Sequence, residues 1–129
     1  MQRYIKLIQF LNMDRHSIKA RKDVEKFLQQ FFPKMEVFGI VFLARDKNQE
    51  ALAMLGISNT TRKEIVKDIT SDDYIETIVD EISYGEMWVF GKDYDGTALY
   101  VKIALGHPNS NTICISFHIA EHPLNYSFK

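Results

Sequence analysis

Cysteine is almost absent from this chain of 129 residues, in which Cys114 stands alone. A lone cysteine has no intrachain disulfide partner, which fits a reducing compartment. Cys114 lies within the β-branched, apolar stretch 112–117, and no neighbour in the sequence would lower the pKa of its thiol. We therefore expect a packed structural thiol and not a nucleophile.

Long hydrophobic runs are also missing, and the longest, residues 37–44, is far shorter than the roughly 20 residues that a transmembrane helix needs. The N-terminal segment lacks the apolar stretch and small-residue cleavage site of a secretory signal. A chain of this length with 46% hydrophobic and 26% charged residues is typical of one globular domain, here residues 1–129. We expect a soluble cytoplasmic protein with no membrane partner.

The net charge of −1 is unevenly distributed along the chain. Residues 1–34 hold 8 basic and 3 acidic residues, whereas residues 35–129 hold 8 basic and 14 acidic ones. A polyanion would therefore be bound by one basic patch. Within the basic region, several residues at helical spacing form a stripe. This stripe is either a solvated helix face or a ridge that contacts phosphates without sequence preference. Its candidate members are Arg15, Lys19, Lys22 and Lys26.

The apolar spacing in the same region predicts a helix that is N-capped by Ser17 and ended by Pro33. A strand is expected over residues 36–44, followed by short helices over 48–55 and from about residue 59. Residues 71–73 form a cap or turn, whereas the segments 4–11 and 74–82 are compatible with either helix or strand. Together these elements predict an α+β fold, in which N-terminal helices pack on an antiparallel sheet with a C-terminal three-strand meander.

The meander is predicted from alternation with a period of two. Asp95-Gly96 is a favoured two-residue hairpin turn, which places Gly91 opposite Tyr100 and leaves that ring uncovered. The same register sets Val89 opposite Lys102. In the last strand, the apolar residues 113, 115, 117 and 119 are expected on the buried face, and Cys114, Ser116 and His118 on the other.

His118 then lies opposite Tyr100 or one step away, with Lys102 and Ser116 beside them. This set suits cleavage of an RNA backbone by the ribose 2′-hydroxyl. Histidine is the side chain whose ordinary pKa lies near neutrality, so His118 would transfer protons. Lys102 would oppose the additional charge on phosphorus, and Tyr100 would orient the hydroxyl or stack on a base. The alternative is that Tyr100 and His118 are amphipathic residues on a solvated sheet face.

A zinc site is a competing interpretation, because residues 118–122 match the H-x-x-E-H pattern. That chemistry needs both histidines on one helix, whereas the preceding residues favour a strand and Pro123 follows at once. We therefore expect no metal and no cofactor. Glu121, His122 and Tyr126 could still assist from the end of the strand.

With these residues in view, the chain resembles the MqsR-like toxins of bacterial type II toxin-antitoxin systems, within the RelE-like fold group. The resemblance covers roughly residues 36–126 and rests on motifs that occur in order. They are Arg45-Asp46-Lys47-Asn48, Ala51-Leu52, Leu55-Gly56-Ile57, Asp73-Tyr74, Trp88-Val89-Phe90-Gly91-Lys92, Tyr100-Val101-Lys102 and the run from Ile113 to Glu121.

The resemblance implies a RelE-like fold and a metal-independent mRNA interferase that cuts single-stranded RNA and is held inactive by a cognate antitoxin. It implies that Tyr100 is the active-site tyrosine and that His118 stands where the family places a lysine. Val89 replaces a glutamine of better-known members, so substrate preference does not carry over. The catalytic candidates are His118, Tyr100 and Lys102. The RNA-binding candidates are Lys92, Trp88, Tyr126 and the four basic residues of the N-terminal stripe.

Two other functions stay open. A non-catalytic regulator that binds protein or RNA would use the exposed aromatic residues and the uneven charge for association. A metal-dependent hydrolase would lose activity to a chelator. Docking on the ribosome is possible but not favoured, because polyanionic surroundings select strongly basic proteins.

Overall fold

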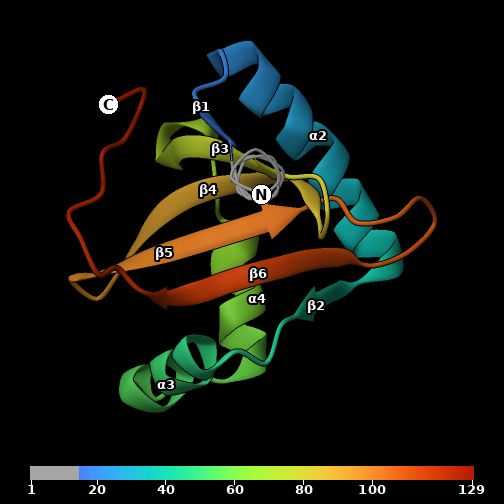
Figure 1. The fold of residues 1–129 in the computed structure, drawn as a ribbon. Helices are drawn as coiled ribbons and strands as arrows, with labels where there is room; N and C mark the ends of the chain where they lie inside the picture. The colour runs from blue at the N-terminus through green and yellow to red at the C-terminus, as the bar shows by residue number, and fades with distance from the viewer. Residues whose placement is uncertain (1–14) are drawn as a thin grey trace, which may run out of the picture.

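The computed structural model describes residues 15–129, which form a six-stranded sheet with three α-helices (Figure 1). The strand order is β1-β3-β4-β5-β6-β2, and every neighbouring pair is antiparallel except β2 and β6. The elements are β1 (Arg15–Ser17), α2 (Arg21–Phe38), β2 (Ile40–Phe42), α3 (Asp46–Leu55), α4 (Asn59–Lys67), the 3₁₀ turn η1 (Ser71–Asp73), β3 (Tyr74–Asp80), β4 (Gly85–Tyr94), β5 (Thr97–Ala104) and β6 (Thr112–Ile119). The expected α+β class is confirmed.

Helices α2 and α4 cover one face of the sheet, which we call the helix-covered face (Figure 1). The main core lies between them and the strands, and its side chains include Phe27, Val66, Phe90, Val101 and Phe117. The opposite face carries Val89, Tyr100, Lys102, Ser116 and His118, and we call it the Tyr100 face. Within residues 15–129 no helix is long and apolar enough to cross a membrane.

The first described helix differs from its prediction at both ends. Ser17 belongs to β1, and α2 begins at Arg21 after Ala20. The helix also continues through Pro33 to Phe38. Met35 is buried in the core, and Lys34 Nζ donates to the carbonyls of Leu105 and Ser110 at 2.5 and 2.7 Å. These contacts favour the continued helix and oppose the cost of about 3 kcal/mol of an internal proline.

The longer helix leaves fewer residues for the next strand, which was predicted over 36–44 and is only Ile40–Phe42. The two short helices are confirmed. Gly56 ends α3 with φ 64°, and Ser58 caps α4 by accepting a hydrogen bond from Thr61 N at 3.1 Å. The predicted turn at residues 71–73 is η1, and the segment left open at 74–82 contains β3. The segment 4–11 lies outside the described residues.

The β4–β5 hairpin has the predicted register. Asp95 and Gly96 have φ of 49° and 84°, which are the left-handed values that a tight hairpin turn requires. As a result Gly91 pairs with Tyr100 and Val89 with Lys102. On the other side of β5, Tyr100 pairs with His118 and Lys102 with Ser116.

A bulge in β6 makes the predicted alternation wrong in the first half of that strand. Lys102 pairs with Ser116 and Ile103 with Cys114, so Ile115 is an extra residue. Ile113 and Ile115 therefore pack on the Tyr100 face, whereas Cys114 lies on the helix-covered face. The expected packed thiol is confirmed, because Cys114 is fully buried and its burial raises the pKa of the thiol to about 12.

Candidate functional site

The rings of Tyr100 and His118 form the centre of the candidate site. They come from opposed positions on β5 and β6, and their centroids are 5.1 Å apart with an interplanar angle of 14°. The pair is therefore stacked. The prediction that Tyr100, Lys102 and His118 share one face of the sheet is confirmed.

The backbone at the end of β6 orients the imidazole. His118 Nδ1 lies 2.9 Å from the carbonyl oxygen of Ile119. A carbonyl only accepts hydrogen bonds, so Nδ1 carries a proton and donates it. In the neutral ring, Nε2 is then the nitrogen with a lone pair, which is the arrangement that a general base needs.

The phenol of Tyr100 is held in its protonated form. Its partial burial raises the pKa of the hydroxyl above the ordinary value, the carboxylate of Glu76 raises it further, and the guanidinium of Arg45 opposes both. Tyr100 is thus a hydrogen-bond donor at neutral pH.

A cavity of about 430 Å³ opens beside the two rings. Lys102 and Ser116 line it from the sheet, and Arg45 and Lys47 line it from the start of α3. Arg45 Nη1 donates to Ser116 Oγ at 3.2 Å. Lys47 Nζ lies 2.6 Å from Glu121 Oε1, and this hydrogen bond lowers the pKa of the Glu121 carboxyl.

Helix α3 reaches the site because Asn48 replaces a missing strand neighbour. Strand β2 pairs with β6 only as far as Cys114. Beyond that point, Asn48 Nδ2 donates to the carbonyl of Ile115 at 3.0 Å, and Asn48 Oδ1 accepts from Phe117 N at 2.9 Å. A buried side chain thus continues the hydrogen-bond ladder and holds the start of α3 against β6.

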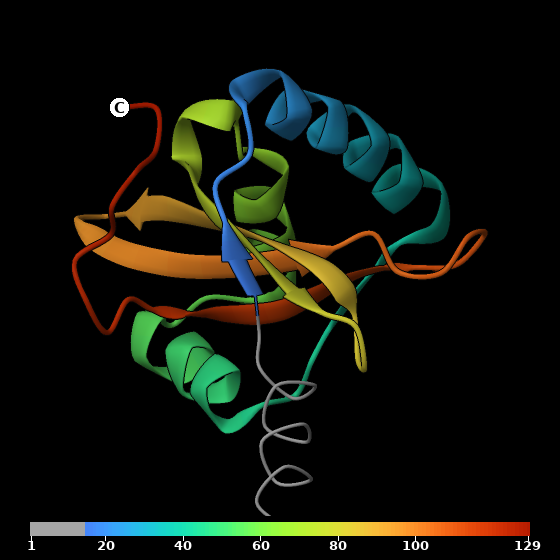
Figure 2. The ribbon, with the colours of Figure 1, turned by 45° about the horizontal axis from the view of Figure 1, so that its top comes forward.

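The C-terminal tail forms another wall of the cavity through Pro123, Leu124 and Asn125. The tail leaves β6 and runs past the end of the β4–β5 hairpin toward β3 and α2 (Figure 2). Ser127 anchors it, since its N–H donates to Tyr74 O at 3.0 Å and its hydroxyl donates to Ile75 O at 2.6 Å.

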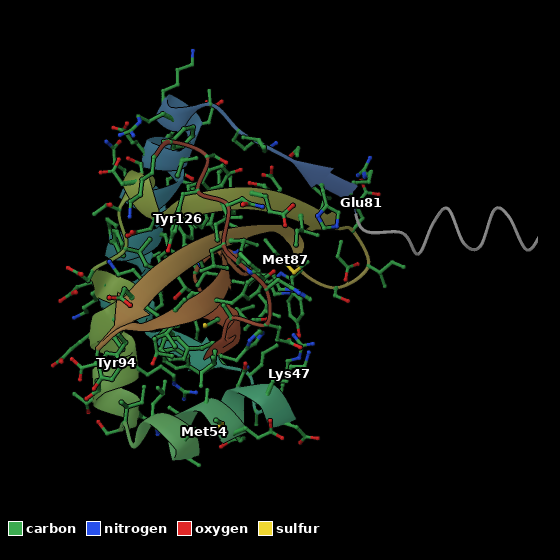
Figure 3. All side chains as sticks on the ribbon, turned by 90° about the vertical axis from the view of Figure 1, so that its left-hand side faces the viewer. Lys47, Met54, Glu81, Met87, Tyr94 and Tyr126 are labelled. Carbon is green, nitrogen blue, oxygen red and sulfur yellow. The ribbon has the colours of Figure 1, made fainter. Side chains whose placement is uncertain are left out.

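Gly91 has a different role from the one predicted. A Cβ atom at Gly91 would lie 2.5 Å from Tyr126 Oη and 2.7 Å from Leu124 Cδ1. The glycine therefore makes room for the tail, whereas Tyr100 is partly exposed and lines the cavity. Figure 3 shows Tyr126 on this tail and Lys47 at the start of α3. Tyr126 covers Gly91 and does not line the cavity.

No family model, curated protein or solved structure matches this chain. The chemistry of the cavity is therefore the basis on which a function can be assigned.

Two predicted RNA-binding residues lie on the helix-covered face of the sheet, away from the cavity. Trp88 is only 7% exposed and stacks on Phe27 at a centroid distance of 4.4 Å, so it is a core residue. Lys92 Nζ lies 3.1 Å from Asp68 Oδ2 and 3.2 Å from Asp73 Oδ2. Burial alone would lower the pKa of Lys92, but hydrogen bonds to the two carboxylates raise it overall.

The basic N-terminal stripe does not line the cavity beside Tyr100 and His118. Arg15 pairs with Glu81, and Lys19 Nζ lies 3.2 Å from Glu86 Oε2. Lys22 and Lys26 are exposed on α2. Lys19 and Lys26 border a separate cavity of about 500 Å³ near Phe27 and Trp88, on the helix-covered face.

The residues of the zinc-like pattern do not form a helix, because β6 extends to Ile119 and the chain then turns. Glu121 and His122 do line the main cavity. Within residues 15–129, no group of three or more His, Cys, Asp or Glu side chains is placed to hold a metal ion.

The prediction missed three charged residues of the cavity, Arg45, Lys47 and Glu76. They come from segments far from β5 and β6 in the sequence. The only signal that could have found two of them is the run Arg45-Asp46-Lys47-Asn48, which carried the resemblance but received no role at the site.

Proposed function

We propose that the protein is a metal-independent endoribonuclease that cuts single-stranded RNA in the cytoplasm, and that it is the toxin of a type II toxin-antitoxin pair. The observation that carries the proposal is the stacked pair of Tyr100 and His118 at a cavity that also contains the cations Arg45, Lys47 and Lys102. A proton-transfer group, a hydrogen-bond donor and positive charge are what cleavage by an internal hydroxyl needs.

In the proposed reaction, His118 Nε2 takes the proton of the ribose 2′-hydroxyl. The 2′-oxygen forms a bond to phosphorus, and the bond from phosphorus to the 5′-oxygen breaks. The leaving 5′-oxygen takes a proton from solvent, and the imidazolium of His118 later returns its proton to solvent. The products are a 2′,3′-cyclic phosphate and a free 5′-hydroxyl. Tyr100 donates a hydrogen bond to the reacting ribose phosphate, and Lys102 opposes the negative charge that develops on it.

The resemblance to MqsR-like toxins supports this assignment in two places. The Tyr-Val-Lys strand is β5 and the Ser-Phe-His strand is β6, and their site residues face each other. The cognate antitoxin, the RelE-like fold and the RNA substrate are proposed from that resemblance. Because His118 replaces a lysine, we expect cleavage to depend on pH near neutrality more strongly than it would with a permanent cation.

Purified protein with single-stranded RNA, in the presence of a chelator, provides the test. We expect His118→Ala to lower the cleavage rate by about 100-fold or more, the usual contribution of a positioned acid or base. His107→Ala is the matched control, since His107 is exposed in the β5–β6 connection. Circular dichroism spectra would verify that both variants fold. Cleavage by His118→Ala at the wild-type rate would refute the mechanism.

Lysine variants give an independent contrast. Lys102→Ala should slow cleavage, because Lys102 lines the cavity. Lys92→Ala should leave the cleavage rate of the folded protein unchanged, because Lys92 pairs with Asp68 and Asp73 on the other face. Equal effects of both substitutions on cleavage would contradict the assignment of the site.

A non-catalytic binding module is the second candidate. The observation that favours it is the cluster of exposed apolar side chains next to the edge strand β2, where Val37 is 73% and Val41 is 43% exposed. Such a module would bind RNA or a protein without cutting RNA. Its binding would be unaffected by His118→Ala and Tyr100→Phe.

A further inference from the structure

The cavity beside Tyr100 and His118 is the central part of a longer groove. A smaller cavity of about 180 Å³ shares Lys47, His118 and Glu121 with it. A third cavity, of about 360 Å³, shares Arg45 and Lys102 with it. Because each neighbouring pair has lining residues in common, the three cavities adjoin one another in a row along the Tyr100 face, and we call this row the groove.

Basic side chains lie at both borders within this groove. Lys47 and His118 stand between the small and central cavities, and Arg45 and Lys102 stand between the central and third cavities. Tyr100 and Lys102 are two residues apart on β5, so the two borders are separated by about 7 Å along the strand. That separation is comparable to the distance between consecutive phosphates of an extended single strand.

Of the four acidic side chains that line the groove, all except Glu50 are already engaged. Glu76 Oε1 lies 2.7 Å from His16 Nδ1, and Glu121 lies 2.6 Å from Lys47 Nζ. Asp80 Oδ1 accepts from the backbone N–H groups of Ile82 and Ser83 at 3.1 and 3.3 Å. These contacts reduce the repulsion that the carboxylates would exert on a nucleic acid backbone.

Arg45 is held in the groove by a neutral partner. Its guanidinium donates to the hydroxyl of Ser116, which is 2% exposed and therefore fixed. Among residues 15–129, no carboxylate lies within ion-pair distance of Arg45. A planar guanidinium held by a neutral partner keeps donors for the bidentate binding of a phosphate.

We propose that the RNA backbone follows this groove and that Arg45 binds the phosphate next to the scissile one. The inference rests on the proposed ribonuclease function and assigns a second phosphate subsite to it. The scissile phosphate lies at the His118 border, and the adjacent phosphate lies at the Arg45 border. Arg45 therefore fixes the position of the RNA backbone, and His118 cleaves the bond one nucleotide away from the phosphate that Arg45 binds.

The test uses 2′-O-methyl oligonucleotides with a single ribonucleotide, which permit attack at one linkage only. Their sequence is taken from a cleavage site mapped in natural RNA. A methylphosphonate, which carries no charge, replaces the linkage next to the scissile one, first on its 5′ side and then on its 3′ side. We expect one of these two substrates to lose about tenfold in kcat/KM with the wild-type protein.

With Arg45→Ala, we expect that penalty to disappear. Without the guanidinium, the adjacent phosphate makes no ionic contact that the loss of its charge could remove. Ser116→Ala should reduce the penalty, since Arg45 loses its anchor. Arg21→Ala is the matched control, because Arg21 at the start of α2 pairs with Asp72 of η1, and neither residue lines the groove. In this variant the penalty should persist.

The possible failures are distinct. If neither methylphosphonate slows wild-type cleavage, or if the penalty persists in Arg45→Ala, the subsite is refuted and the ribonuclease assignment stands. If wild-type protein cuts neither natural RNA nor the unmodified chimeric oligonucleotide, the proposed function is refuted, and the subsite with it.

Discussion

Replacing Asn48 with alanine should destabilise the protein more than the same replacement at Asn111 does. Asn48 is 1% exposed and makes three hydrogen bonds to the backbone. Its amide nitrogen donates to Leu43 O at 2.9 Å and to Ile115 O at 3.0 Å, and its amide oxygen accepts from Phe117 N at 2.9 Å. The substitution removes all three bonds at once.

The expected cost depends on where these groups lie. The bonds to Ile115 and Phe117 are buried, whereas the bond to Leu43 is partly accessible. An unsatisfied buried backbone group costs about 1–3 kcal/mol, and a partly accessible one costs less because water replaces the partner. We expect the free energy of unfolding to fall by about 3–4 kcal/mol, a large part of the roughly 5–15 kcal/mol typical of a domain.

Urea denaturation measures this loss, and the midpoint should fall by more than about 1 M. Asn111→Ala is the matched control, because the Asn111 amide makes one exposed hydrogen bond, to Phe38 O at 2.7 Å. It should cost about 1 kcal/mol or less. If Asn48→Ala costs no more than Asn111→Ala, the bridging role of Asn48 between α3 and β6 is refuted.

Two further predictions concern the tail and the thiol. Gly91→Ala should cost about 1–3 kcal/mol in thermal unfolding, because its Cβ would lie 2.5 Å from Tyr126 Oη, and adding Tyr126→Ala should recover part of the loss. An unchanged melting temperature for Gly91→Ala would contradict the close packing of the tail. Burial raises the pKa of Cys114 from 9.0 to about 12, so the folded state binds this proton more tightly than the unfolded state does. Its contribution to stability is complete below about pH 9 and is lost between about pH 9 and 12, by up to about 1.4 kcal/mol per pH unit. Cys114→Ala should lack this part of the slope in denaturation series across that range, and identical slopes would show that the thiol does not titrate as stated.

The hairpin and the Tyr100–His118 pair could be predicted because their causes are local. A two-residue turn at Asp95-Gly96 fixes the pairing of β4 with β5. The same alternation would also have placed Trp88 and Lys92 correctly. Both alternate along the strand with Val89 and Gly91, which the predicted register places opposite Lys102 and Tyr100. Their assignment to RNA binding on the same face therefore contradicted the pattern already in use.

The remaining features depend on contacts between distant segments. The bulge at Ile115 is stabilised by burial of that side chain and by its hydrogen bond to Asn48, which lies 67 residues earlier. The passage of α2 through Pro33 depends on Lys34 contacting carbonyls more than 70 residues later. Local propensity carries no information on such partners, and for the same reason Arg45 and Lys47 were not placed at the site.

The Lys34 ammonium group also affects where the sequence can change length. It donates to carbonyls on both stems of the β5–β6 connection, at Leu105 on one side and at Ser110 and Asn111 on the other. Between these points, residues 107–109 are exposed. The tip can therefore accommodate an inserted peptide or fluorophore while strand pairing is maintained at its base. His118, six residues beyond the start of β6, would keep its position.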